Sequence, residues 1–91
     1  MLAWQRTGEH AALYDLLGIV AARRGDAKLA RECFAWSIRL DPSRFSAHMN
    51  LGQLALELGA LSDAEVSFAT AAQLRPNDSR AAERLQRAKQ H

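Results

Sequence analysis

The side chains that could act in catalysis or bind a metal are few and lie far apart in the sequence. The three histidines, His10, His48 and His91, would have to meet in space to hold a metal ion or to serve as a general base. They fall in a predicted linker, a predicted packing position and the end of the chain. Asp63 and Glu65 are two positions apart, so on a helix they do not share a face. We therefore predict no enzyme, no metal site and no cofactor.

Nucleophilic and phosphate-binding motifs are also missing. Cys33 is the only cysteine, so the chain holds no internal disulfide. No basic neighbour or helix start is placed to lower the pKa of its thiol, and we interpret it as a small, partly buried apolar residue. The five glycines never cluster as a phosphate-cradling loop requires. The serines lack a histidine and an acid in a recognisable catalytic order.

The strongest charged feature is basic and lies near the C-terminus. Residues 79–91 hold four basic residues against Glu83 alone, whereas the whole chain carries a net charge of only +2. Guanidinium groups bind carboxylates through charge-assisted hydrogen bonds, so this segment could recognise an acidic group. A broad basic face interleaved with aromatic residues is missing, and nucleic acid is not a predicted partner. The basic residues are Arg80, Arg84, Arg87 and Lys89.

These residues belong to a sequence in which one stretch occurs twice. Residues 11–44 and 45–78 carry the same residue types 34 positions apart. Such a period indicates a supersecondary unit that cannot bury its apolar face alone. The matching positions are Leu17-Gly18 with Leu51-Gly52, Gly25 with Gly59, Ala30 with Ala64, Phe34 with Phe68, and Pro42 with Pro76.

Apolar spacing predicts a helix in almost every segment. Leu13, Leu17 and Val20 recur at three- and four-residue intervals, so a helix at about 11–24 should carry them, with Tyr14 and Ala21, as an apolar stripe on one face. Residues 1–10 are expected to form half a helix that ends at Gly8. The other predicted helices cover about 27–40, 44–58, 61–74 and 79–89. Gly25 and Gly59 are predicted C-terminal caps, and the predicted N-terminal caps are Asp26, Ser43, and either Asn77 or Asp78.

The repeated positions resemble those of the tetratricopeptide repeat family. The match covers residues 11–44 and 45–78 as two repeats, and residues 79–91 take the place of the capping helix. His48 departs from the pattern, because it replaces the customary aromatic residue. The resemblance implies an all-α fold: a right-handed superhelical α-solenoid of antiparallel helix pairs with a C-terminal capping helix, in one domain over residues 1–91.

The same resemblance implies a protein–protein interaction module without catalytic activity. In this family the first helix of each pair lines a concave groove that binds a peptide or a helix of another protein. The expected groove residues are Asp15, Leu16, Ile19 and Arg23 from the first repeat, Met49, Asn50 and Gln53 from the second, and Arg80, Arg84 and Arg87 from the cap.

Some co-chaperones of this family clamp the C-terminal carboxylate of a partner. Asn50, Arg80 and Arg84 match three of the clamp positions, whereas Asp15 and Ile19 occupy two others and do not match. Asp15 would repel a carboxylate, so we do not predict a full clamp. We instead propose that Asn50, Arg80 and Arg84 bind an acidic side chain or tail. The alternative is that these arginines form only a solvated face on the last helix.

An apolar cluster on the predicted groove has three explanations. Leu16, Ile19 and Met49 fall where the family usually carries polar residues, and exposed apolar clusters generally mark contact surfaces. The cluster could bind apolar anchors of a partner, a second copy of this chain, or the N-terminal segment with Trp4. Trp36 is expected to point outward from its helix, either as a contact for a partner or packed sideways against the N-terminal half-helix.

The length of 91 residues suits a single domain. No stretch has the length of an apolar membrane span, and no signal peptide is recognised at the N-terminus. We expect a soluble, cytoplasmic protein, or a periplasmic one if a leader has been removed, and the composition hints at a bacterial source. Two repeats are fewer than the three or so usually needed for stability. The alternative function is therefore an oligomerising or scaffold segment, either self-associating or part of a longer array.

Overall fold

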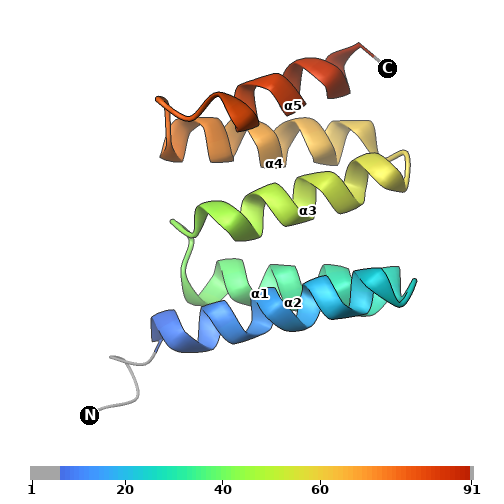
Figure 1. The fold of residues 1–91 in the computed structure, drawn as a ribbon, viewed down its shortest axis with the longest axis vertical. Coiled ribbons are helices and arrows are strands. Elements are labelled where there is room, and N and C mark those ends of the chain that lie inside the picture. The colour runs from blue at the N-terminus through green and yellow to red at the C-terminus, as the bar shows by residue number, and fades with distance from the viewer. Residues whose placement is uncertain (1–6, 91) are drawn as a thin grey trace.

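The computed structural model describes residues 7–90, and these residues form an all-helical fold (Figure 1). The predicted fold class is confirmed: this part of the chain holds five α-helices and no strand. The helices are α1 (Thr7–Arg23), α2 (Ala27–Leu40), α3 (Phe45–Glu57), α4 (Leu61–Leu74) and α5 (Ser79–Lys89).

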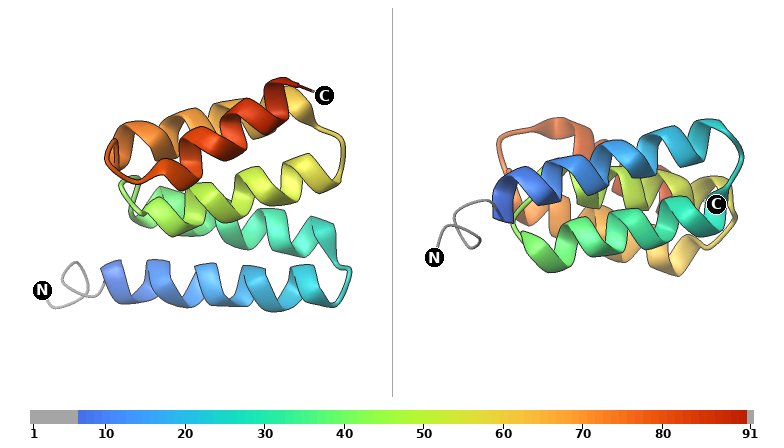
Figure 2. Two further views of the ribbon diagram at one scale, coloured as in Figure 1. Left: turned by 45° about the horizontal axis from the view of Figure 1, so that its top comes forward. Right: turned by 90° about the horizontal axis from the view of Figure 1, so that it is seen from below.

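The helices stack in chain order as antiparallel pairs. Each helix packs against the next one along the chain, and α1 also contacts α3. As a result α1, α3 and α5 form one layer, and α2 and α4 form the other (Figure 1). Figure 2 shows α1 and α2 side by side at one end of the stack, with α5 at the opposite end. The two layers follow from the repeat, because each 34-residue unit contributes one helix to each layer.

The turns inside the two helix pairs have the geometry that the glycines predict. Gly25 and Gly59 adopt positive φ angles of 82° and 78°, where a side chain would be strained. The backbone N–H of Asp26 donates to the carbonyl of Ala21 at 2.9 Å, and the equivalent bond from Ala60 to Ala55 is 2.8 Å long. Both glycines therefore act as C-terminal caps, as predicted.

Two of the predicted N-terminal caps are confirmed and one is wrong. The Asp26 carboxylate accepts a hydrogen bond from the Leu29 backbone N–H at 3.1 Å, and Asp78 accepts one from the Arg80 N–H at 3.0 Å. Ser43 does not cap α3, whose first helical residue is Phe45. The Ser43 hydroxyl donates to Asp41 Oδ1 at 2.7 Å and thereby closes the turn before the helix.

The N-terminal boundary differs from the prediction at Gly8. Helix α1 begins at Thr7 and runs through Gly8 without a break, so the helix end predicted there is wrong. In the repeat register Gly8 stands where Pro42 and Pro76 end the second helices. Proline blocks a helix by steric clash and by its missing N–H, whereas glycine only weakens it by about 1 kcal/mol. The rest of the predicted half-helix, residues 1–6, lies outside the described residues.

Two aromatic rings of the core lie against glycines of the neighbouring helix. The Phe68 ring is fully buried and lies over Gly52, where a Cβ atom would come within 2.7 Å of a ring carbon. Phe34 lies over Gly18 in the same way. Paired helices can approach this closely because the two glycines have no side chain.

The apolar stripe predicted on one face of α1 is largely exposed. Leu13 is 54% exposed and Val20 is 42% exposed, although Ala21 on the same helix is buried. One period later Ala47 and Leu54 are buried, because α3 packs against α2. The described residues contain no helix before α1 that could cover it in the same way. The stripe therefore lies at the N-terminal end of the stack.

Acidification is expected to weaken the start of α5. The Asp78 carboxylate accepts hydrogen bonds from the Arg80 guanidinium, with 2.6 Å between Nη2 and Oδ2, and from the Arg80 backbone N–H. These bonds hold the pKa of Asp78 at about 2, below its ordinary value of 3.8. Because the folded-state pKa is the lower one, the carboxylate stabilises α5 above about pH 4, and this contribution is lost as the pH falls toward about 2.

Circular dichroism during acid titration measures this effect. The matched variant is Asp78→Asn, which keeps a capping oxygen but cannot ionise over this range. Both proteins share every other carboxylate, so the difference between their curves isolates Asp78. We expect the wild type to lose additional helicity between about pH 4 and pH 2, and superimposable curves would contradict the prediction.

Candidate functional site

The layer of α1, α3 and α5 carries two neighbouring hollows that meet at Asn50. The first, which we call the arginine hollow, has a volume of about 510 Å³ and lies between the start of α3 and α5. The second, the α1–α3 hollow, has a volume of about 400 Å³. Besides Asn50, the arginine hollow is lined by Asp41, Ser43, Arg44, Phe45, Ser46, Met49, Arg75, Arg80 and Arg84. The α1–α3 hollow is lined by Ile19, Ala22, Arg23, Phe34, Gln53, Leu54 and Glu57.

The arginine hollow concentrates positive charge around one aromatic ring. Four of its lining residues are arginines, and Asp41 is its only acidic lining residue. The guanidinium of Arg75 lies 4.4 Å from the centre of the buried Phe45 ring, and that of Arg80 lies 5.4 Å from it. Cation–π attraction holds both groups over the ring despite their like charges. The hollow can therefore attract an anionic group.

The four arginines differ in how far they are already paired. Arg44 forms an ion pair with Asp15, with 3.1 Å from Nε to Oδ2, and Arg80 pairs with Asp78. Arg84 donates a 3.3 Å hydrogen bond to the neutral Gln53 amide. Within residues 7–90, neither Arg75 nor Arg84 makes an ion pair. These two side chains are the ones whose charge is left for a ligand.

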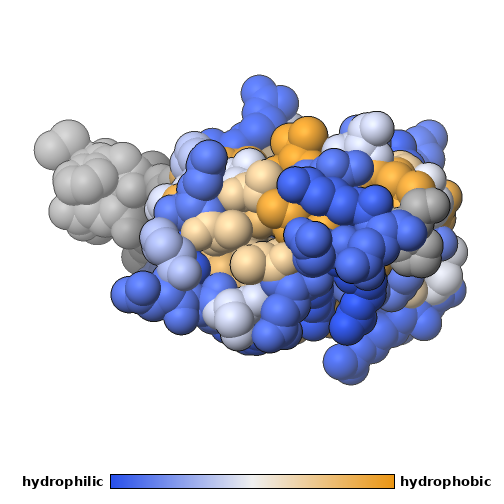
Figure 3. All heavy atoms as spheres, turned by 90° about the horizontal axis from the view of Figure 1, so that it is seen from above, coloured by the Kyte–Doolittle hydropathy of each residue, from blue (hydrophilic) through white to orange (hydrophobic). Residues whose placement is uncertain are grey.

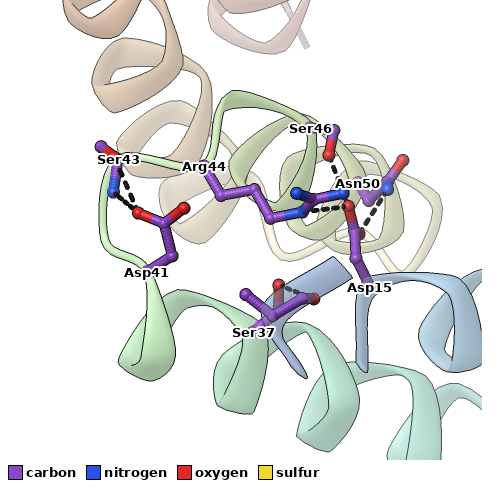
Figure 4. Close-up of polar contacts among 8 residues, drawn as sticks. Asp15, Ser37, Asp41, Ser43, Arg44, Ser46 and Asn50 are labelled. Atoms are coloured by element: carbon purple, nitrogen blue, oxygen red, sulfur yellow. Dashed lines mark hydrogen bonds and ion pairs between the residues drawn. The ribbon is translucent and has the colours of Figure 1, made fainter. Parts of the chain in front are cut away.

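A buried carboxylate, that of Asp15, joins α1 to α3 through residues that also line the arginine hollow (Figure 4). Asp15 is only 3% exposed. Its Oδ2 atom accepts hydrogen bonds from Arg44 and from the Ser46 hydroxyl, and its Oδ1 atom accepts one from the Asn50 amide at 2.8 Å. The negative charge is thus met by one cation and two neutral donors, as burial of a charge requires.

Comparison with known families agrees with the repeat and with this arrangement. A family model described as tetratricopeptide repeat matches residues 16–82, which is most of the chain. The chain belongs to the tetratricopeptide repeat family. Its members generally mediate protein–protein interaction and are typically not catalytic. No curated protein matches the chain.

The tetratricopeptide register placed Asp15 and Met49 on the open groove; this is wrong for Asp15, which lines neither hollow, whereas Met49 lines the arginine hollow but is largely buried. Asp15 lies buried beneath α3, and Met49, one period later, is 7% exposed in the core beside Phe45. The third residue at this phase, Glu83 on α5, is exposed. Helix α3 covers this position of α1, and α5 covers it on α3. Within the described residues no helix follows α5 that could cover Glu83. Asp15 therefore does not repel a ligand in the groove.

The predicted apolar cluster of Leu16, Ile19 and Met49 does not form a single exposed surface. Leu16 is 56% exposed, Ile19 is half-buried in the wall of the α1–α3 hollow, and Met49 belongs to the core.

Asn50 reaches both hollows, but its amide donates to Asp15. Its first role is to hold α3 against α1 in the tetratricopeptide stack.

The other predicted contact residues lie in different places. Arg23 and Gln53 line the α1–α3 hollow, whereas Arg87 is exposed on α5 and lines neither hollow. Trp36 is half-exposed on α2, and its ring stacks on Tyr14 of α1 with 6.2 Å between the ring centres. It therefore points outward, as predicted, and also packs sideways against α1.

Among the residues of the arginine hollow that sequence reasoning missed are two of its arginines, Arg44 and Arg75, and its aromatic residue, Phe45. The repeat register held a signal for Phe45, because this aromatic residue stands where the equivalent positions carry Ala11 and Ser79. Arg44 lies in a turn and Arg75 at a helix end. In such segments the spacing of apolar residues does not predict where a side chain points.

The structure offers little for metal or thiol chemistry in residues 7–90. This part of the chain holds no group of three or more His, Cys, Asp or Glu residues that could bind a metal ion. The Nε2 atom of His48 lies 2.9 Å from the Pro42 carbonyl oxygen, as suits a packing residue. Burial, together with Glu32 and Asp26, raises the pKa of the Cys33 thiol above 9.0. None of the described helices is long and apolar enough to cross a membrane.

Proposed function

We propose that this protein binds a segment of another protein across the two hollows of the α1, α3 and α5 layer, and that it does so without catalysis. The observation that carries the proposal is that four arginines line one hollow of about 510 Å³. A large cationic hollow on the exposed face of an interaction repeat suits an acidic partner.

The chemistry of the two hollows indicates what the partner segment must present. The arginine hollow suits a carboxylate, which a guanidinium can bind through two parallel hydrogen bonds. Arg75 and Arg84 are the expected ligands, because Arg44 and Arg80 already pair with Asp15 and Asp78. The α1–α3 hollow, with apolar Ile19, Ala22 and Leu54 in its wall, suits an apolar side chain of the same segment.

Selection from a random peptide library displayed on phage tests this proposal without knowledge of the natural partner. We expect the wild type to enrich peptides that carry Asp or Glu next to an apolar residue. Binding of one selected peptide is then measured by isothermal titration calorimetry. The Arg75→Glu/Arg84→Glu variant should bind that peptide at least about tenfold more weakly, since each charge-assisted hydrogen bond contributes about 1.5–3 kcal/mol.

The matched control is Lys28→Glu/Arg31→Glu. Both residues are exposed on α2, on the opposite layer from the arginine hollow, and together they carry the same charge change as the double groove variant. Equal weakening by the control and the groove variant would mean that net charge, not the hollow, governs binding. A selection that enriches no acidic peptide would also contradict the proposal.

A further inference from the structure

The N-terminal end of the stack presents an unusual amount of apolar surface. Three leucines and a valine on α1 are about half exposed, and α2, which lies beside α1 at this end (Figure 2), adds two more large apolar residues. Contiguous apolar patches of a few hundred Å² on a soluble protein generally mark contact sites. We call this surface the end face, and it consists of Leu13, Leu16, Leu17, Val20, Leu29 and Trp36.

At the equivalent positions of α3 and α5, some of the side chains that match the end face are buried by helix packing within the molecule. Leu13 and Val20 correspond to Ala47 and Leu54 of α3, which are buried against α2. In α5 the same phases carry Ala81 and Ala88, which are buried against α4. The surface that α2 covers on α3, and that α4 covers on α5, is thus exposed on α1. At these positions α1 also carries larger apolar side chains than α5 does.

The repeat alone does not require the apolar residues that α2 adds to the end face. Leu29 and Trp36 stand where the second repeat has the polar residues Asp63 and Thr70. The Trp36 ring is held in place by stacking on Tyr14 and by the Arg39 guanidinium, 4.7 Å from the ring centre. Tryptophan, tyrosine and arginine are the residues most enriched in the energetic centres of interfaces.

We infer that the end face binds the end face of a second copy of this chain, with the two α1 helices antiparallel. Leu13, Leu16 or Leu17, and Val20 recur at intervals of three and four residues, the spacing of a two-helix seam. A two-fold axis between Leu16 and Leu17 places Leu13 opposite the partner's Val20 and Leu16 opposite the partner's Leu17.

The charges at the ends of the seam select this orientation. Glu9 of α1 and Arg24, the first residue after α1, are exposed beyond the two ends of the apolar stripe, at equal numbers of sequence positions from its centre. Antiparallel pairing therefore sets Glu9 against the partner's Arg24 twice, whereas parallel pairing would set like charges together. A symmetric pair of this kind is the commonest form of protein oligomer.

The opposite end of the stack does not offer a matching apolar surface. Figure 3 looks onto the α5 end, where hydrophilic side chains surround a smaller apolar area. Exposed residues there include Glu83, Gln86, Arg87 and Lys89. Head-to-tail stacking of copies would bury these charges against the end face at a high desolvation cost. Self-association through two end faces avoids this cost and stops at a dimer.

Sedimentation equilibrium of the full chain tests the inference. The end face consists of six apolar residues, whereas a standard interface has about 20–30 residues a side, so we expect a dissociation constant of about 1–100 µM. Leu17→Glu should raise this constant at least about a hundredfold, because it would bury an unpaired charge in the seam. The matched control is Val66→Glu, which changes a 67% exposed apolar residue on α4 and should leave the dimer unchanged.

A charge exchange tests the orientation. Glu9→Arg and Arg24→Glu should each raise the dissociation constant by about threefold or more, and the double variant should restore it. A wild type that stays monomeric at several hundred micromolar, roughly the upper limit for specific association, would overturn the inference and leave residues 1–6 or another protein to cover the face. A dimer insensitive to Leu17→Glu, or a double exchange without recovery, would overturn it as well. The inference does not depend on the proposed peptide binding.

Discussion

Replacing Phe68 with alanine is expected to lower the free energy of unfolding by about 3–5 kcal/mol. The Phe68 ring is fully buried, and it packs in a cluster with Ala64 and Ala71 of its own helix and with residues of α3 and α5. Its face lies against Gly52, so no side chain on that side can move in to fill the space. The truncation would therefore leave a cavity at the point where α3, α4 and α5 meet.

Urea denaturation followed by circular dichroism measures this loss. Small domains are only about 5–15 kcal/mol stable, so the variant should unfold at a much lower urea concentration. Val66→Ala is the matched control, because it also shortens an apolar side chain of α4 but at an exposed position. Its effect should stay within about 0.5 kcal/mol. Similar losses in the two variants would mean that the Phe68 cluster is not the centre of the core.

Replacing Asp15 with alanine is expected to cost about 2–3 kcal/mol of stability. The change removes the acceptor of three hydrogen bonds and leaves the Arg44 guanidinium without its ion-pair partner. The Arg44 side chain is 29% exposed, so water can partly solvate the freed charge, and the cost stays below the 3–5 kcal/mol of a fully buried pair. The contact between α1 and α3 should be the part that loosens.

The same denaturation experiment, with hydrogen exchange of α1 as a second readout, checks this expectation. Glu32→Ala is the matched control, since it removes an exposed carboxylate from the middle of α2. We expect the Asp15 variant to exchange faster in α1 than in α4, because the lost bonds join α1 to α3. A variant as stable as the control would show that the buried network adds little.

Much of the fold could be predicted because its determinants are local. The positive φ angles of Gly25 and Gly59 and the caps at Asp26 and Asp78 depend on residues within a few positions along the chain. The 34-residue period then repeats these local signals, so the helix boundaries inside the two repeats follow closely. The miss at Gly8 has a local cause too, because a glycine without a following proline does not end a helix.

The candidate site was less predictable because it depends on which helix covers which face. Asp15 and Met49 share one phase with Glu83, yet two of the three are buried. The repeat register predicts that all three side chains point to the same side of their helices. Whether such a side chain is exposed to solvent depends on whether a neighbouring helix packs over it. The convergence of Arg75 and Arg84 on one hollow likewise joins a helix end to the middle of another helix.

The sequence by itself therefore determined the helices, their turns, their order and the family, since these rest on contacts between residues close in the chain and on a period that repeats them. Only the tertiary structure decided that Asp15 pairs with Arg44 and that the Arg75 and Arg80 guanidinium groups lie over the Phe45 ring. It also decided that the apolar stripe of α1 is exposed. The physical reason is that burial and pairing belong to surfaces formed by residues about 30 positions apart, whose approach no local pattern records.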